Sequence, residues 1–171
     1  MLTSWQDRLE LNDVRLSPQM RASSVVLSGG SGRYSLDPLA LEIDEASSFE
    51  LWVTADDLRT MVTQSLPPQI SRLDLTLGDG VILIDAAIRL FFEMSGRVTC
   101  RIRIEEGKKL FVEVLETTIP ATNVGMLQGM IQQINPVFDA GRQGVPLVLE
   151  HVEITPRAVR VSGQALPGRV S

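Results

Sequence analysis

Apolar residues alternate with other residues along several stretches of the chain, and this period of two predicts strands. In VILIDAAIRLFFEM, residues 81–94, every even position is apolar, including Leu90 and Phe92, whereas the odd positions mix apolar with charged residues. We therefore expect one long strand over residues 81–94, with its even face buried and its second face partly covered. A strand of this length must coil or carry a bulge.

Three further alternating segments predict the partners of this strand: residues 70–77, 98–105 and 109–118. The connections between these segments have the sequences GDG, SGR and EGK, and their glycines suit hairpin turns that need positive φ. The expected arrangement is an antiparallel meander of four strands.

Other strands are expected outside the meander. LELNDVRL (9–16) and FELWV (49–53) precede it, and a closing hairpin pairs residues 145–154 with residues 158–166 through TPR. The cluster GGSG, residues 29–32, predicts a turn or a mobile loop.

Two segments with helical periodicity interrupt the strands. In the first, Thr54 suits an N-cap, and Asp56 and Asp57 fall in the first turn, where the helix dipole favours negative charge. Four apolar residues then follow at helical spacing, and two prolines close the helix. These residues are Leu58, Met61, Val62 and Leu66, followed by Pro67 and Pro68.

The second helical segment, residues 123–141, has Asn123 as its expected cap and Pro136 as the residue that kinks or ends it. Its apolar arc is broad. One stripe consists of Val124, Leu127, Ile131, Ile134 and Phe138, and Met126, Met130 and Val137 widen it. Two interpretations stay open: the helices pack an ordinary core against the sheet, or helices and sheet enclose an apolar groove whose flexible methionines adapt to a ligand.

Length and charge narrow the class of protein. A chain of 171 residues is long enough for one domain with a hydrophobic core, so we expect a single domain over residues 1–171. The net charge is −5, and no Lys/Arg cluster tracks a phosphate backbone, which argues against nucleic acid as a partner.

No catalytic or metal-binding constellation stands out. His151 is the one histidine, no G-x-S-x-G elbow occurs, and GGSGR lacks the Lys-Ser/Thr of a phosphate loop. Cys100 falls on the apolar face of its strand, which favours a buried structural thiol. We therefore expect no enzyme, no cofactor and no metal ion.

The localisation is left open by the sequence. The chain starts without the basic and apolar regions of a signal peptide, and no apolar run reaches the roughly 20 residues of a membrane span. The expectation is a soluble protein of the cell envelope if an export signal has been trimmed, and of the cytoplasm otherwise.

The order of these elements resembles a known family. The phrases FELWVTADDLRTMVTQSL, ISRLDLTLGDGVILID and PLVLEHVEITPRAVRVSGQA make the chain similar to the LmeA-like phospholipid-binding family of bacteria, over residues 9–167. The resemblance implies a tubular lipid-binding (TULIP-like) half-barrel, in which a long curved sheet wraps around helices and holds lipid tails. It also implies a place at the cell envelope.

The sequence thus predicts an α+β fold, with a long, strongly curved antiparallel sheet around two main helices. Together with the resemblance, it predicts non-catalytic binding or transport of a phospholipid or similar amphiphile. The residues expected to line the groove are Leu58, Met61, Val62, Ile84, Ile88, Phe92, Leu127, Met130 and Ile134.

Arg89, Arg101 and Arg103 would meet a phosphate if they lie at the groove mouth, but solvated charges on the strand face are the favoured interpretation. The alternative function is a structural or assembly module. Such a module would use the same apolar surface to form a homodimer or to dock on an envelope partner, without any lipid. Peripheral contact with a membrane is a separate expectation.

Overall fold

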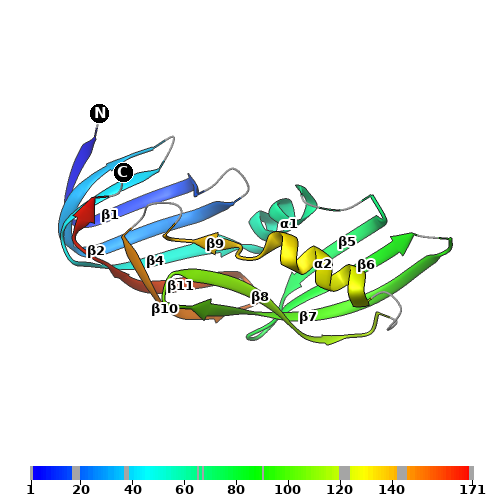
Figure 1. Cartoon of the computed structure of the whole chain (residues 1–171). Helices are drawn as coiled ribbons and strands as arrows, with labels where there is room; N and C mark the ends of the chain where they lie inside the picture. Colours follow the sequence, from blue (N-terminus) through cyan, green and yellow to red (C-terminus); the bar gives the residue numbers. More distant parts are fainter. Residues whose placement is uncertain are drawn as a thin grey trace.

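The chain forms an elongated molecule with a sheet at each end. The computed structural model describes residues 2–16, 20–36, 39–64, 66, 68–89, 91–119, 124–141 and 146–169. A seven-stranded sheet and both chain ends occupy one end, and a five-stranded sheet with two helices on one face occupies the other (Figure 1). The expected α+β class and curved antiparallel sheet are confirmed.

The seven-stranded sheet has the order β10-β11-β4-β2-β3-β12, with β1 paired to β2, and all its neighbours are antiparallel. Its strands are β1 (Thr3–Arg15), β2 (Arg21–Ser35), β3 (Ala40–Glu45), β4 (Ser47–Thr54), β10 (Leu147–Ile154), β11 (Ala158–Ala165) and β12 (Gly168–Arg169). The expected closing hairpin corresponds to β10 and β11.

The predicted turn at GGSG is wrong, because these residues lie inside β2. Gly29 and Gly30 have φ of 75° and 73°, and a Cβ on Gly30 would lie 2.4 Å from the carbonyl oxygen of Glu45. The strand bends at this glycine pair and changes its partner from β4 to β3. The glycines therefore curve the sheet without ending the strand. The core of this sheet includes the buried residues Phe49, Leu27 and Leu41.

The five-stranded sheet has the order β5-β6-β7-β8-β9 and is antiparallel throughout. Its strands are β5 (Ile70–Leu77), β6 (Ile82–Arg89), β7 (Glu93–Glu105), β8 (Lys109–Thr117) and β9 (Phe138–Asp139). The predicted meander is present, and its GDG and EGK turns are confirmed by Gly80 and Gly107, which both have positive φ.

The predicted single strand over residues 81–94 is wrong, because a turn divides it into β6 and the start of β7. The turn expected at SGR is also wrong, since Gly96 pairs with Ala86 within the β6–β7 ladder. A Cβ on Gly96 would lie 2.6 Å from Cγ1 of Ile119. Close packing of Ile119, rather than turn geometry, therefore explains this glycine.

The alternating pattern conceals the turn for a geometric reason. Ile88 pairs with Met94 and Ile84 with Val98, so even positions face even positions across the hairpin. Residues directly opposed in an antiparallel pair lie on the same face of the sheet. The buried face therefore keeps its parity through the turn, and the turn itself carries no glycine or proline.

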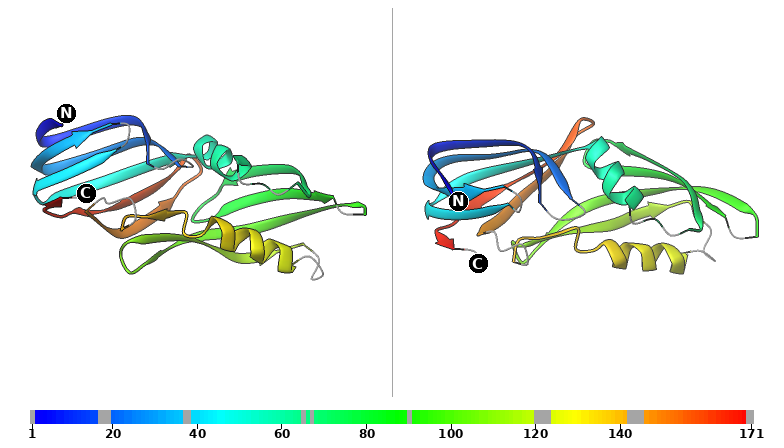
Figure 2. Two further views of the ribbon diagram at one scale, coloured as in Figure 1. Left: turned by 45° about the horizontal axis from the view of Figure 1, so that its top comes forward. Right: turned by 90° about the horizontal axis from the view of Figure 1, so that it is seen from above.

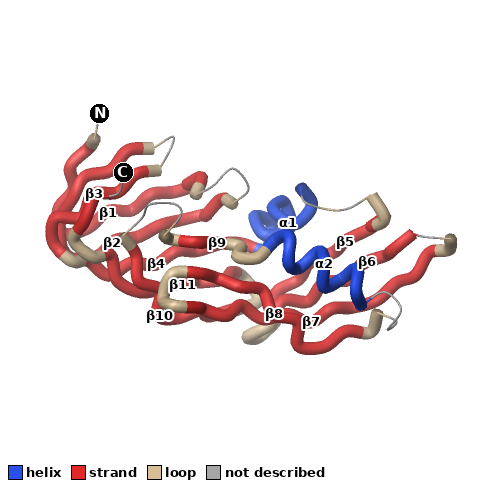
Figure 3. The backbone as a smooth tube through the Cα atoms, in the orientation of Figure 1, coloured by secondary structure: helices blue, strands red, loops and turns tan. Residues whose placement is uncertain are grey.

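The two helices are α1 (Ala55–Gln64) and α2 (Val124–Ile134), and both lie against the same face of β5–β8 (Figures 2 and 3). The predicted cap of α1 is confirmed: the Asp57 backbone N–H donates to Oγ1 of Thr54 at 3.2 Å, and that hydroxyl donates to the Asp57 carboxylate at 2.9 Å. Pro67, Leu90 and Asn123, named in the sequence predictions, lie outside the described residues.

Candidate functional site

An apolar groove lies between the two helices and the five-stranded sheet. Among the described residues, the side chains that line it are all aliphatic or sulfur-containing, and none is charged. They are Leu58, Met61, Val62, Leu66, Ile70, Leu73, Leu75, Ile82, Ile84, Ala86, Ile88, Val98, Cys100, Ile102, Val112, Ile119, Met126, Leu127, Met130, Ile131, Ile134 and Val137. Such a lining offers water only the weak hydrogen bonds of a thiol and of thioether sulfurs.

The groove is narrow and extends along β6, whose residues Ile82 and Ile88 both line it. The empty space between its walls is about 1020 Å³ when the part open to solvent is included, but the centre of a water molecule fits in only about 80 Å³ of it. One water needs roughly 10–15 Å³ of such space and several polar partners. The groove has the room but lacks the partners, so its shape and chemistry suit a slender apolar chain.

The helices cover the groove without being sealed into a core. Leu58 is the one residue of α1 that is fully buried, and no described side chain of α2 is. The apolar stripe residues Met61, Met130 and Ile134 are all half-buried. The half-buried stripes agree with a groove that is partly open.

Each helix is tied to the rest of the molecule near the junction of the two sheets. The α1 helix follows β4 directly, and the guanidinium of Arg59 donates to the Leu75 carbonyl oxygen at 2.7 Å. Just after α2, the Asn135 side chain exchanges two hydrogen bonds of 2.9 Å with the backbone of Val112. The opposite end of α2, its start, lies toward the end of the molecule that carries the β6–β7 turn (Figure 1).

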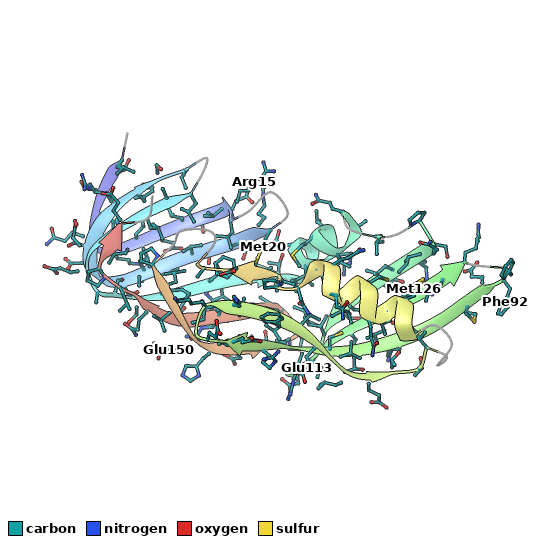
Figure 4. The ribbon with its side chains drawn as sticks, in the orientation of Figure 1. Arg15, Met20, Phe92, Glu113, Met126 and Glu150 are labelled. Carbon is teal, nitrogen blue, oxygen red and sulfur yellow. The ribbon has the colours of Figure 1, made fainter. Side chains whose placement is uncertain are left out.

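Eight of the nine residues predicted to line a groove are brought together in this one. They come from α1 (Leu58, Met61, Val62), from β6 (Ile84, Ile88) and from α2 (Leu127, Met130, Ile134). Phe92 is the exception and requires a correction. It lies on the β6–β7 turn with 66% of its surface exposed, at the far tip of the molecule, because β6 ends at Arg89 (Figure 4).

The remaining lining residues differ in how they could have been found. Leu73, Leu75, Cys100 and Ile102 occupy the apolar phase of β5 and β7, so extending the period-two pattern to these strands would have included them. Ile119 comes from the connection after β8, where no periodicity exists. Its position depends on tertiary packing alone.

The outer face of the five-stranded sheet carries ion pairs. Arg97 holds Asp85 with two bonds of 2.9 and 3.1 Å, and Arg101 holds Glu113 at 3.0 Å. These hydrogen bonds keep the pKa values of the Asp85 and Glu113 carboxyls below their ordinary range. Asp85 thus lies on the solvated face of the sheet. This explains why charged residues occur among the odd positions of residues 81–94.

The arginines considered as phosphate ligands are also paired with carboxylates. Arg103 lies 3.0 Å from Glu105 and stacks over the Phe111 ring at 5.3 Å, and Arg89 lies 3.5 Å from Glu93. No charged residue therefore lines the groove among the described residues.

Cys100 is buried in the groove wall, where burial raises the pKa of its thiol to about 11. A thiol with so high a pKa is a poor nucleophile at neutral pH. Within the described ranges, no group of three or more His, Cys, Asp or Glu could hold a metal ion. None of the described helices has the length and apolar character needed to cross a membrane.

A second, smaller apolar pocket lies inside the curl of the seven-stranded sheet, and the centre of a water molecule fits in only about 20 Å³ of it. Its walls include Phe49, Leu41 and Phe138. Val137 lines the groove and the next residue, Phe138, lines this pocket, so the start of β9 stands between the two spaces.

Comparison with known proteins gives no relative from which a function could be inferred. No family model, curated protein or solved structure matches the chain.

Proposed function

We propose that the protein binds or carries a phospholipid or a similar amphiphile, without catalysis, with acyl chain held in the groove. The observation that supports this most strongly is a long groove with a wholly apolar described lining beneath two half-buried helices. Burial contributes roughly 0.8 kcal/mol per methylene, so a short length of chain offsets a large part of the cost of association.

The proposal extends to the headgroup and to the fold. With Arg89, Arg101 and Arg103 paired with carboxylates, the protein would select weakly among headgroups. The curved sheet beneath two helices is the feature that supports a TULIP-like half-barrel related to the LmeA-like family. An experimental structure with lipid along the groove would test both points.

The deciding experiment is native mass spectrometry of the purified protein, followed by organic extraction and analysis of any lipid. We expect a stoichiometric lipid adduct, formed either in the cell or after incubation with mixed phospholipids. An apo mass that stays unchanged after that incubation contradicts the proposal.

A matched pair of variants on α2 sharpens this test. Met130→Glu places a carboxylate in the groove, whereas Gln128→Glu adds the same charge at an exposed position of the same helix. Met130→Glu should lose the adduct and Gln128→Glu should keep it. If Met130→Glu instead breaks an oligomer and lipid is never found, the assembly module is the better account.

A further inference from the structure

Two adjacent aromatic side chains are exposed at the tip of the molecule. Phe91 is fully exposed and Phe92 is 66% exposed, and both lie on the turn between β6 and β7. The turn projects beyond the helices at the end opposite the seven-stranded sheet (Figures 2 and 4). Two neighbouring phenylalanines in water are costly, and such exposure marks a contact surface.

The surroundings of this tip carry no net charge of either sign. Arg89 and Glu93, which flank the turn, pair with each other at 3.5 Å. The chain between Glu116 and Asp139 contains no charged residue, and it includes α2, whose exposed positions are glycine and glutamine. The start of α2 lies at the same end as the turn (Figures 1 and 2).

The groove reaches toward this end. Ile88 and Ile70, which pair next to the tip, both line it. The described side-chain hydrogen bonds that tie α1 and α2 to the sheet, from Arg59 and Asn135, lie toward the other end, so only apolar packing holds the helices nearer the tip. The helices can therefore separate from the sheet most easily near the tip, where a ligand would enter.

We propose that Phe91 and Phe92 insert into the interfacial region of a phospholipid bilayer and that lipid enters and leaves the groove at this tip. The second half of this inference rests on the proposed function, whereas the first half does not. The occupant is a lipid surface, because a narrow projecting turn with two apolar rings and no net charge matches the chemistry of that region.

The net charge of the protein predicts which lipid headgroups the bilayer should carry. The chain carries a net charge of −5, so an anionic surface would repel it. Attachment by aromatic insertion should therefore favour zwitterionic phosphatidylcholine vesicles and should depend little on salt, unlike attachment by basic residues.

Vesicle flotation tests whether Phe91 and Phe92 attach the protein to a bilayer. The full chain should float with phosphatidylcholine vesicles equally at low and high salt. Phe91→Ser/Phe92→Ser should reduce the bound fraction by about tenfold or more. The control Leu36→Ser/Leu166→Ser removes two exposed leucines at the seven-stranded end and should float normally.

A gain-of-signal variant keeps the test independent of folding losses. Phe91→Trp should still bind, and its emission should shift to the blue when vesicles are added, as an indole does on leaving water. Flotation of the double serine variant at the wild-type level, or no added blue shift in Phe91→Trp relative to wild type, would overturn the tip assignment.

The transfer of a fluorescent phospholipid between vesicles separates the two proposals. If the tip loads the groove, Phe91→Ser/Phe92→Ser should slow transfer while keeping the lipid adduct already bound. A tip that floats normally on a chain that never holds lipid would overturn the loading route and the proposed function together, leaving membrane attachment alone. Wild-type transfer by the double serine variant would overturn loading at the tip.

Discussion

The side-chain amide of Asn135 is paired with the backbone of Val112 as if it were a neighbouring strand. Its Oδ1 accepts from the Val112 N–H and its Nδ2 donates to the Val112 carbonyl, both at 2.9 Å. Because Asn135 directly follows α2, this pair holds the end of the helix against β8. The position of one groove wall depends on it.

Asn135→Ala should release that end of α2. It leaves both backbone groups of Val112 without this partner, so we expect a loss of about 1–3 kcal/mol in the free energy of unfolding and faster exchange of bound lipid. Chemical denaturation and lipid exchange measure the two effects. Gln133→Ala, at an exposed position of α2, is the control; equal behaviour of the two variants would contradict the anchoring role.

Filling the groove should block the ligand without unfolding the protein. Ile84→Phe adds volume on the groove side of β6, whereas Leu83→Phe adds the same group on the opposite face. Ile84→Phe should bind a fluorescent phospholipid several-fold more weakly at unchanged or raised melting temperature. Equal binding by both variants would place the lipid elsewhere.

Cys100 should report on the groove through its reactivity. Its pKa of about 11 means that the rate of alkylation should rise past the ordinary thiol pKa of 9.0 and level off only near 11. The folded state holds this proton more tightly than the unfolded state, so the associated stability is complete below pH 9 and is lost as pH rises through 11.

Bound lipid should slow the alkylation of Cys100 further, because the residue lines the groove. The control is Ser95→Cys in a Cys100→Ser background, which places a thiol at an exposed position of the same strand. Its labelling should be fast and indifferent to lipid. Rapid labelling of Cys100 at neutral pH would show that the thiol is not buried in solution.

Two glycines should respond in opposite directions to alanine. Gly96→Ala places a methyl group 2.6 Å from Ile119 and should destabilise the fold by about 1–3 kcal/mol. Gly125→Ala meets nothing within 4 Å in α2 and should raise helix stability by up to about 1 kcal/mol. Thermal unfolding of both variants checks the signs; a neutral Gly96→Ala would mean that Ile119 moves freely.

Local pattern alone determined most of the elements. Period-two alternation located β5, β8 and the β10–β11 hairpin, and the Thr54 cap located the start of α1. Helical spacing identified six lining residues and period-two alternation identified two more, because the residues that face a groove follow the same periodicity as those that face a core. Periodicity depends only on neighbours in the chain, so one sequence is enough to read it.

The tertiary structure alone decided where the chain turns between β6 and β7 and which structural role the glycines have. Because even positions pair with even positions across the β6–β7 hairpin, the sequence pattern continues through the turn and predicts Phe92 in the groove, whereas Phe92 lies exposed at the tip. Gly29 and Gly30 bend a strand because β3 and β4 share β2, a pairing that joins distant segments. Such contacts between remote residues leave no local period to detect.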